Sequence, residues 1–261
     1  MKKSGDCGAE DRGIRMGEKR FLMMVRIGVV PKEIETEWNR WYNGEHIPKR
    51  LKIPGFLSAR RYKAVENEYN ILVRTGPPDE IQGCPRRYIT FYELSRLDVL
   101  SSQPYLELLH QEASLPPNSF EAVTVNLPDF HVGLYEQIYP GQGDYQRPKT
   151  SYIFVIGHDA PPEKEEEFNA WYNTEHIPGF IKKVPGFIAS RRFRRVEAAL
   201  PPLLGQTSSN PQYVAIHDIE DEDVPGSEAF LNTRDTPWTR WIKSWYTRRF
   251  RLLSHCIYSS D

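Results

Sequence analysis

Two kinds of hydrophobic pattern follow each other along the chain, and their order occurs twice. Residues 21–30 and 152–157 are runs of apolar, β-branched and aromatic residues, which predicts two strands. Residues 31–47 and 162–177 open with proline and acidic residues and then carry aromatic residues at helical spacing, which predicts two helices.

The remaining patterns complete the same order in each half. Further strands are predicted at 57–65 and 188–196, each after a Pro-Gly turn, and at 88–94 and 213–219. Second helices are predicted within 97–111 and within 224–246, the latter broken at Pro237, and the closing strands at 130–139 and 250–258. Each half therefore predicts βαββαβ, the ferredoxin-like arrangement.

A direct sequence repeat supports this division. The letters WYNxEHIP begin at Trp41 and recur at Trp171, and PGF begins at Pro54 and recurs at Pro185, each time followed by an Arg-Arg pair. Two linked motifs in one order indicate a tandem duplication. We expect one unit at 21–139 and a second at 151–261, joined by a Gly- and Pro-rich linker at 140–150. Residues 1–20 are predicted to be a disordered tail, in which Met16 offers an alternative start.

A ferredoxin-like unit covers only one face of its sheet with helices, so the other face needs a partner. The fused second copy is the obvious one. We therefore predict an α+β protein in which the two sheets face each other across a pseudo-twofold axis. This is a pseudo-dimeric α+β barrel with the helices outside.

Charge and composition exclude several classes of protein. With 34 Lys and Arg against 35 Asp and Glu the net charge is -1, which offers no basic surface for nucleic acid. The longest apolar stretch, 21–30, is interrupted by Arg26 and is too short to cross a membrane. The 3 cysteines are far apart without metal-ligand spacing, which favours a reducing, cytoplasmic location and no metal site.

The repeated helix carries the first candidate chemistry. On a helical wheel at about 100° per residue, Glu45 falls within the stripe formed by Trp41 and Tyr42, and His46 lies on its edge. A carboxylate and an imidazole on an aromatic face are typical of acid/base sites, although an ion pair and a helix-end histidine would also explain them. The second copy repeats the set as Trp171, Tyr172, Glu175 and His176.

The two Arg-Arg pairs are the second group of residues that could take part in chemistry. Side chains alternate along a strand, so one arginine of each pair faces the helices and the other the barrel interior or its rim. Arg60 is expected to share a face with Phe56, and Arg191 with Phe187, which makes these two the candidates for a substrate pocket. Their anion could be a substrate carboxylate or phenolate, or the glutamates Glu45 and Glu175.

These motifs together resemble the EthD-like branch of the dimeric α+β barrel superfamily, here twice in tandem. The resemblance implies the fold and, through the histidine that recurs in the family's helix motif, a role for His46 and His176. It does not imply one activity, because the superfamily includes monooxygenases without cofactor, isomerases, cyclases, decarboxylases, dehydratases and haem enzymes. Most members build the barrel from two chains, and the fusion leaves further homodimerisation open.

The leading hypothesis is a cofactor-independent lyase or isomerase, of decarboxylase or dehydratase type, acting on a small aromatic or phenolic compound. His46 and His176 would move protons, Glu45 and Glu175 would assist, and Arg60 and Arg191 would bind a substrate anion beside Trp41, Tyr42, Trp171 and Tyr172. A monooxygenase without cofactor is one alternative, and haem binding through His46 or His176 is another. The non-enzymatic alternative is a small-molecule-binding or stress-response barrel, in which the repeated motif only joins helix to sheet.

Overall fold

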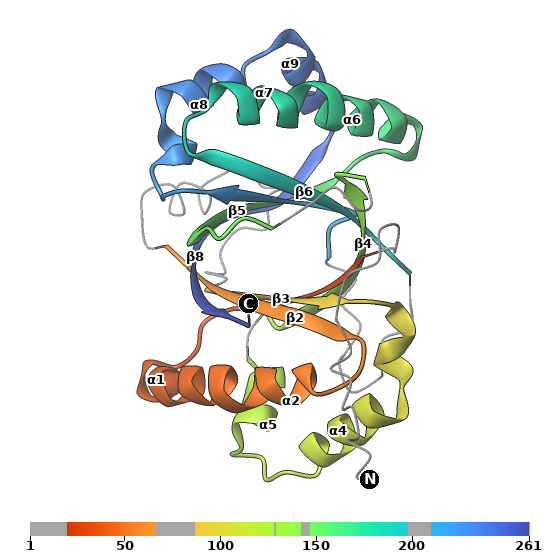
Figure 1. The fold of residues 1–261 in the computed structure, drawn as a ribbon, viewed down its shortest axis with the longest axis vertical. Coiled ribbons are helices and arrows are strands. Elements are labelled where there is room, and N and C mark those ends of the chain that lie inside the picture. Colours follow the sequence, from red (N-terminus) through yellow and green to blue (C-terminus); the bar gives the residue numbers. More distant parts are fainter. Residues whose placement is uncertain (1–19, 66–86, 128, 142–146, 198–209, 261) are drawn as a thin grey trace, which may run out of the picture.

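The computed structural model describes residues 20–65, 87–127, 129–141, 147–197 and 210–260 (Figure 1). The predicted tail, apart from Arg20, lies outside these residues, and so do Met16, Cys7 and Cys84. None of the helices in the described ranges is both long and apolar enough to cross a membrane.

The first unit has the predicted order of elements. Its strands are β1 (Phe21–Ile27), β2 (Phe56–Ala64), β3 (Tyr88–Leu94) and β4 (His131–Tyr139). The first helical segment consists of α1 (Lys32–Trp41), a π-helical turn (Tyr42–His46) and α2 (Ile47–Leu51). The second consists of a 3-10 turn (Leu97–Ser101), α4 (Gln103–Ala113) and α5 (Phe120–Val125). The short helix α5 was not predicted; it starts anew after the Pro116-Pro117 pair, where a continuous helix cannot pass.

The second unit repeats this order. Its strands are β5 (Tyr152–Asp159), β6 (Phe187–Arg195), β7 (Tyr213–Ile219) and β8 (Thr247–Ser259). Its first helical segment runs through a 3-10 turn (Pro162–Lys164), α6 (Glu165–Trp171), a π-helical turn (Tyr172–His176) and α7 (Ile177–Lys183). A 3-10 turn (Val224–Gly226), α8 (Glu228–Thr233) and α9 (Pro237–Lys243) follow. The predicted break at Pro237 is confirmed: α9 begins there, capped by the side chain of Thr236.

The eight strands close into one barrel in the order β1-β3-β2-β8-β5-β7-β6-β4. Two antiparallel ladders join the units, β2 with β8 and β4 with β6. Closure leaves no unpaired sheet edge between the two halves. The helices of the two units cover opposite outer faces (Figure 1), so the predicted pseudo-dimeric α+β barrel is confirmed.

Two kinds of core follow from this geometry. The barrel interior is filled from both units, for example by Tyr62 and Phe91 of the first and Ile153 and Phe193 of the second. Separate clusters lie between each helical layer and its sheet; Trp38 is the centre of the first unit's layer and is completely buried. The face of the sheet to which a side chain points therefore decides which of these environments it enters.

A β-bulge corrects one expectation about these faces. The register of β2 against β3 shifts between Phe56 and Ser58, and that of β6 against β7 shifts between Phe187 and Ala189. Because a bulge inserts one residue, the side chains before it turn to the opposite face. Phe56 and Phe187 therefore pack under the helices and do not share a face with Arg60 and Arg191.

Candidate functional site

The repeated motif folds into a π-helical turn in each unit. In such a turn the hydrogen bonds run from i to i+5, so one extra residue is accommodated and the following side chains rotate back by about 100°. His46 consequently takes the inward position that an ideal α-helix would give to Glu45, and it is only 9% exposed. Glu45 itself is exposed, so the expectation that it lies within the aromatic stripe is wrong.

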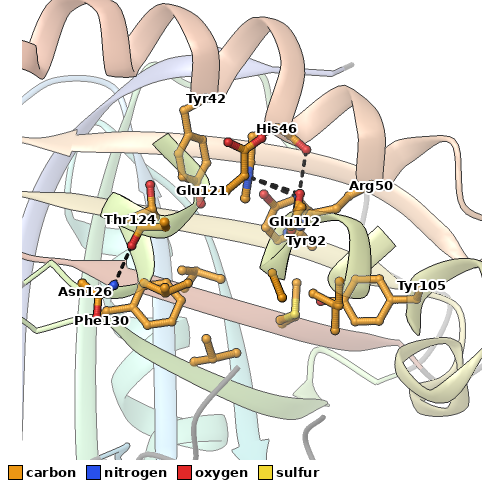
Figure 2. A pocket seen from close by; sticks show the side chains of 17 residues that line it. Tyr42, His46, Arg50, Tyr92, Tyr105, Glu112, Glu121, Thr124, Asn126 and Phe130 are labelled. Atoms are coloured by element: carbon orange, nitrogen blue, oxygen red, sulfur yellow. Dashed lines mark hydrogen bonds and ion pairs between the residues drawn. The ribbon is translucent and has the colours of Figure 1, made fainter. Parts of the chain in front are cut away.

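The helical layer of the first unit encloses a cavity of about 220 Å³ between its helices and the sheet (Figure 2). Its walls are mainly apolar, and they carry polar groups from five elements: the π-helical turn, α2, β3, α4 and α5. The polar and titratable side chains that line it are Tyr42, His46, Arg50, Tyr92, Tyr105, Glu112, Glu121, Thr124 and Asn126. Of the sequence-predicted site residues, Tyr42 and His46 line this cavity, whereas Trp41, Glu45 and Arg60 do not.

Arg50 ties His46 to Glu112. The Arg50 guanidinium forms a bidentate pair with the Glu112 carboxylate, with Nη1 to Oε1 at 3.0 Å and Nη2 to Oε2 at 2.8 Å. The same Nη1 lies 3.2 Å from the His46 Nδ1. The Glu112 pair raises the pKa of Arg50 despite burial, so this side chain stays a cation.

The surroundings of His46 keep it neutral. Burial is the main cause that lowers its pKa well below 6.5, and the charges of Arg50 and Arg61 act in the same direction. A guanidinium can only donate, so a bond from Arg50 to Nδ1 requires the tautomer that carries the ring proton on Nε2; the two hydrogens of Nη1 are shared among this nitrogen, the His46 carbonyl and Glu112 Oε1. In that tautomer, the Nε2–H is a donor for a ligand.

Two tyrosines add hydroxyl groups deep in the same cavity. The side chains of Tyr92 and Tyr105 are completely buried, and neither hydroxyl forms a hydrogen bond of good geometry with the described residues. Burial raises the pKa of Tyr105 to about 12 and raises that of Tyr92 well above its ordinary value, so both are protonated at neutral pH. Tyr42 lies close to the Tyr92 hydroxyl and Arg50 close to that of Tyr105, so these contacts partly satisfy the two hydroxyls, and a polar ligand atom would complete them.

The corresponding region of the second unit has different chemistry. Phe180 occupies the place of Arg50 in the repeat, and the His176 ring packs between Trp171 at 4.2 Å and Phe180 at 4.7 Å between ring centroids. The remaining cleft has a volume of only about 50 Å³. Burial lowers the pKa of His176 as well. Trp171, Tyr172 and His176 line this cleft, whereas Glu175 accepts a hydrogen bond from Thr236 at 2.6 Å outside it.

Arg60 and Arg191 lie on the other side of the sheet, in the barrel interior. Arg191 of the second unit donates to Glu93 of the first at 2.9 Å, and Arg147 donates to the same carboxylate oxygen at 3.0 Å. The pKa of Glu93 is lowered, although burial opposes this, because these guanidinium groups stabilise its charge. The anion beside Arg191 is therefore Glu93 and not Glu175. The cross-unit contact explains why an arginine is buried there.

The second arginine of each pair faces the helices. The Arg61 guanidinium lies 4.2 Å above the Tyr42 ring and donates to Asn43 Oδ1 at 2.9 Å. Arg192 repeats this over Tyr172 at 4.3 Å and donates to Asn173. Burial lowers the pKa of Arg61 to about 10, which leaves it charged at neutral pH close to His46. It contributes to the electrostatics of the cavity without lining it.

Sequence reasoning missed most of the cavity. Arg50 follows His46 by one helical turn, and this spacing predicts that the two side chains are neighbours. Arg50 lies outside the repeated motif on which the predicted site was based. Glu112 and Glu121 come from α4 and α5, far along the chain, and neither belongs to the repeated motif. Within the described residues, no three His, Cys, Asp or Glu side chains gather in a way that could hold a metal ion.

Comparison with known proteins supports the fold. No family model and no curated protein matches the sequence. Among solved structures, a candidate monooxygenase from Fusobacterium nucleatum subsp. nucleatum ATCC 25586 is similar, with 12% identity, a TM-score of 0.51, and coverage of 94% of this chain and 96% of that one. A candidate chlorite dismutase has 11% identity, a TM-score of 0.54 and coverage of 92% and 95%.

An anthrone oxidase-like protein is also similar, with 13% identity, a TM-score of 0.50 and coverage of 93% of this chain and 92% of that one. These proteins share the dimeric α+β barrel fold. The chain therefore has this fold, with both halves of the barrel supplied by one polypeptide. At such low identity the likeness extends to the fold, and the chemistry must be argued from the cavity.

Proposed function

We propose that the first unit's cavity is the active site of a cofactor-independent enzyme that isomerises or dehydrates a small phenolic compound. The observation that carries this proposal is the arrangement of a neutral His46, held by Arg50 and Glu112, in a cavity with buried tyrosine hydroxyls. The proposal places the chemistry in one unit only, because Phe180 replaces this arginine in the other.

The size of the cavity supports a ligand with a single aromatic ring. A cavity of about 150 Å³ is known to hold benzene, and this one has about 220 Å³. That leaves space for a ring with small substituents and not for a polycyclic compound. It is also below the roughly 300–1,000 Å³ of sites for drug-sized ligands, so a haem does not fit, and the second unit's cleft is smaller still.

The charges of the cavity favour a neutral phenol or hydroxyketone over a carboxylate. Arg50 is neutralised by Glu112, and Glu121, the second carboxylate in the lining, pairs with Lys49 at 3.2 Å. Among the residues that the structure describes, no further cation lines the cavity. A substrate carboxylate would therefore meet no uncompensated positive charge, which favours a dehydratase or isomerase over a decarboxylase.

His46 is suited to polarise a substrate oxygen. Its Nε2–H would donate to a carbonyl or phenolic oxygen, and negative charge developing there would be stabilised by this bond and by the nearby cation of Arg50. A neutral histidine in this role gives hydrogen-bonding power without a net charge that repels cationic neighbours. Tyr92 and Tyr105 are further donors for the same ligand.

Glu121 is suited to accept the proton. Its carboxylate lines the cavity and is only 10% exposed, and Lys49 fixes one of its oxygens. With the substrate oxygen polarised by His46, Glu121 would remove a proton from the adjacent carbon to give an enolate. Return of the proton to another carbon completes an isomerisation, and expulsion of a neighbouring hydroxide, which leaves as water with that proton, completes a dehydration. Glu121 takes the part that the sequence assigned to Glu45.

A monooxygenase without cofactor is the second candidate. It shares the first step, formation of a phenolate or enolate, which would then react with O₂. The names of two similar folds, a candidate monooxygenase and an anthrone oxidase-like protein, favour it. Oxygen consumption during turnover distinguishes it from an isomerase or dehydratase, which needs no O₂.

The test is turnover of a panel of one-ring phenols and hydroxyaryl ketones, followed by mass spectrometry and by C–H deuterium exchange in D₂O, with and without O₂. We expect His46→Ala and Glu121→Gln each to lower kcat/KM by roughly 10²–10⁴-fold. The matched controls are His176→Ala and Glu45→Gln, which change the same residue types outside the cavity and should leave the rate within about twofold.

Two results would contradict the proposal. Unchanged exchange and turnover in both cavity variants, with both variants folded, would show that the chemistry takes place elsewhere. Binding of panel members without exchange or product would instead support the non-enzymatic binding barrel.

A further inference from the structure

The two units contain an open cavity and a nearly filled one at corresponding places under their helices. The volume is about 220 Å³ in the first unit and about 50 Å³ in the second. Because the same elements enclose both, the difference must come from the side chains at equivalent positions. A comparison of these positions therefore shows which side chains limit the space.

The strand registers define one equivalent pair on the floor of the cavities. Tyr92 and His217 each stand two residues before the end of their strands, β3 and β7, which have the same length. Met23 of β1 is paired with Tyr92, and Phe154 of β5 is paired with His217. Met23 lines the first cavity and Phe154 lines the second. A flexible side chain in the open cavity thus corresponds to an aromatic ring in the filled one.

Two further exchanges accompany this one. Arg50 corresponds to Phe180 in the repeated motif. Tyr105 corresponds to Phe230, because each is the third residue after the serine that precedes α4 or α8. In the second unit, Phe230 lies 4.6 Å from Phe180 and 6.0 Å from Phe154 between ring centroids. These three rings occupy the space that remains open in the first unit.

In the first unit, the two polar residues at these positions are drawn to partners on the cavity wall. Arg50 lies against Glu112 in the bidentate pair (Figure 2). The Tyr105 ring packs on Phe56 at 5.4 Å between ring centroids. Met23 is the remaining member of the three and the apolar one, so it is the position at which cavity size can change without a change in polar chemistry.

The place of Met23 on its strand supports this role. It is 2% exposed and belongs to the core cluster under the helices, whereas the next residue, Met24, belongs to the barrel interior. Neighbouring side chains of a strand point to opposite faces of the sheet. A methionine side chain is unbranched and adapts to the space around it. A shorter residue would deepen the cavity, and a ring like that of Phe154 would fill it.

We propose that Met23 is a specificity-determining residue, whose side chain limits the first unit's cavity to ligands with a single aromatic ring. This inference rests on the proposed function, since it treats that cavity as the substrate site. Met23 carries no group that exchanges a proton at neutral pH. A change of this residue therefore alters the shape of the cavity and leaves His46 and Glu121 in place.

The experiment measures the Kd of phenol and of 1-naphthol for the full chain by isothermal titration calorimetry. The wild type should bind phenol about tenfold or more tightly than 1-naphthol, because a misfit in an apolar pocket costs at least that much. Met23→Ala removes Cγ, Sδ and Cε, and the surroundings relax only partly. It should shift the ratio of the two Kd values about tenfold or more toward 1-naphthol. Met23→Phe should weaken phenol binding by about tenfold or more.

Met24→Ala and Met24→Phe are the matched controls, because Met24 is the same residue type on the same strand but faces the barrel interior. Met24→Ala should leave the Kd ratio within about twofold. A second readout needs no ligand. Met23→Phe places its ring in an existing cavity and should keep or raise the melting temperature, whereas Met24→Phe overpacks a filled interior and should lower it.

An unchanged Kd ratio in Met23→Ala, an equal change in Met24→Ala, or no phenol binding by the wild type would overturn the inference. An equal fall in melting temperature in Met23→Phe and Met24→Phe would also overturn it, because no open space would then lie beside Met23. Met23→Val replaces Met23→Ala if that variant does not fold. Phenol binding with the expected selectivity, but without turnover of the phenol panel, would contradict the proposed function and leave the role of Met23 standing.

Discussion

At the scale of single residues, the buried ion pair of Arg50 with Glu112 decides the state of the candidate site. Arg50 is 4% exposed, and the carboxylate of Glu112 compensates its charge. Removing one partner of a buried pair leaves the other charge without compensation, which costs more than the pair contributes when intact. The pair therefore stabilises the contact between α2 and α4 and holds the guanidinium beside His46.

This argument predicts that Glu112→Gln lowers the free energy of unfolding by about 2–4 kcal/mol, measured by urea denaturation at pH 7. Glu107→Gln, on the exposed face of the same helix, is the control and should change it by less than about 0.5 kcal/mol. A similarly small decrease in the free energy of unfolding in both variants would mean that another anion or water compensates Arg50.

How much of the site was predictable differs from residue to residue. His46 could be found because the motif around it is repeated and aromatic. Glu112 could not, because its role arises from a contact between α2 and α4 that the sequence pattern does not encode. Arg60 and Arg191 are both buried, but the partner of Arg191 is Glu93 across the interface between the units, and such long-range pairing is invisible in one strand.

At the scale of elements, the order and type of nearly all helices and strands followed from hydrophobic periodicity, and the errors came from local irregularities. The bulges in β2 and β6 and the π-helical turns each insert one residue, so each changes the phase of the side chains that follow. A helical wheel, and the rule that side chains alternate along a strand, both assume that no residue is inserted. The elements were therefore predictable, whereas the faces near these insertions were not.

The π-helical turn of the first unit contains Gly44, which is exposed and whose position has open space for a side chain. The second unit has Thr174 at the same place. Gly44→Ala should therefore stabilise the protein by about 0.5–1 kcal/mol through the reduced freedom of the unfolded chain. A loss of stability in thermal or urea unfolding would show that the π turn depends on glycine.

At the scale of the whole molecule, histidines whose pKa is lowered by burial couple folding to pH: His46, His176 and His217 most strongly, and the less buried His255 as well. The pKa values of His46 and His176 lie well below 6.5 and that of His217 is about 3, mainly because burial disfavours the charged ring. The unfolded chain binds protons at about pH 6.5. The unfolded state therefore holds more protons below that pH, and stability is complete above it and falls as the pH decreases.

We expect the free energy of unfolding to fall between pH 6.5 and 4.5 with uptake of up to about three protons, or about 1.4 kcal/mol per pH unit for each histidine. Carboxylates with lowered pKa, such as Glu93, add their loss only below about pH 4.5. His217→Gln should reduce the slope by about one proton, and the exposed His110→Gln should not. An unchanged slope in His217→Gln would contradict the assignment.

The extra residue in the π-helical turn also indicates the order of the evolutionary steps that produced this chain. Since the same insertion stands at Tyr42–His46 and at Tyr172–His176, the simplest history places it in a single ancestral unit before the gene was duplicated. That ancestor needed a second copy of itself to cover its open sheet. The inward histidine is then the older feature, and the exchange that left Arg50 in one half and Phe180 in the other followed duplication, when the two copies became free to diverge.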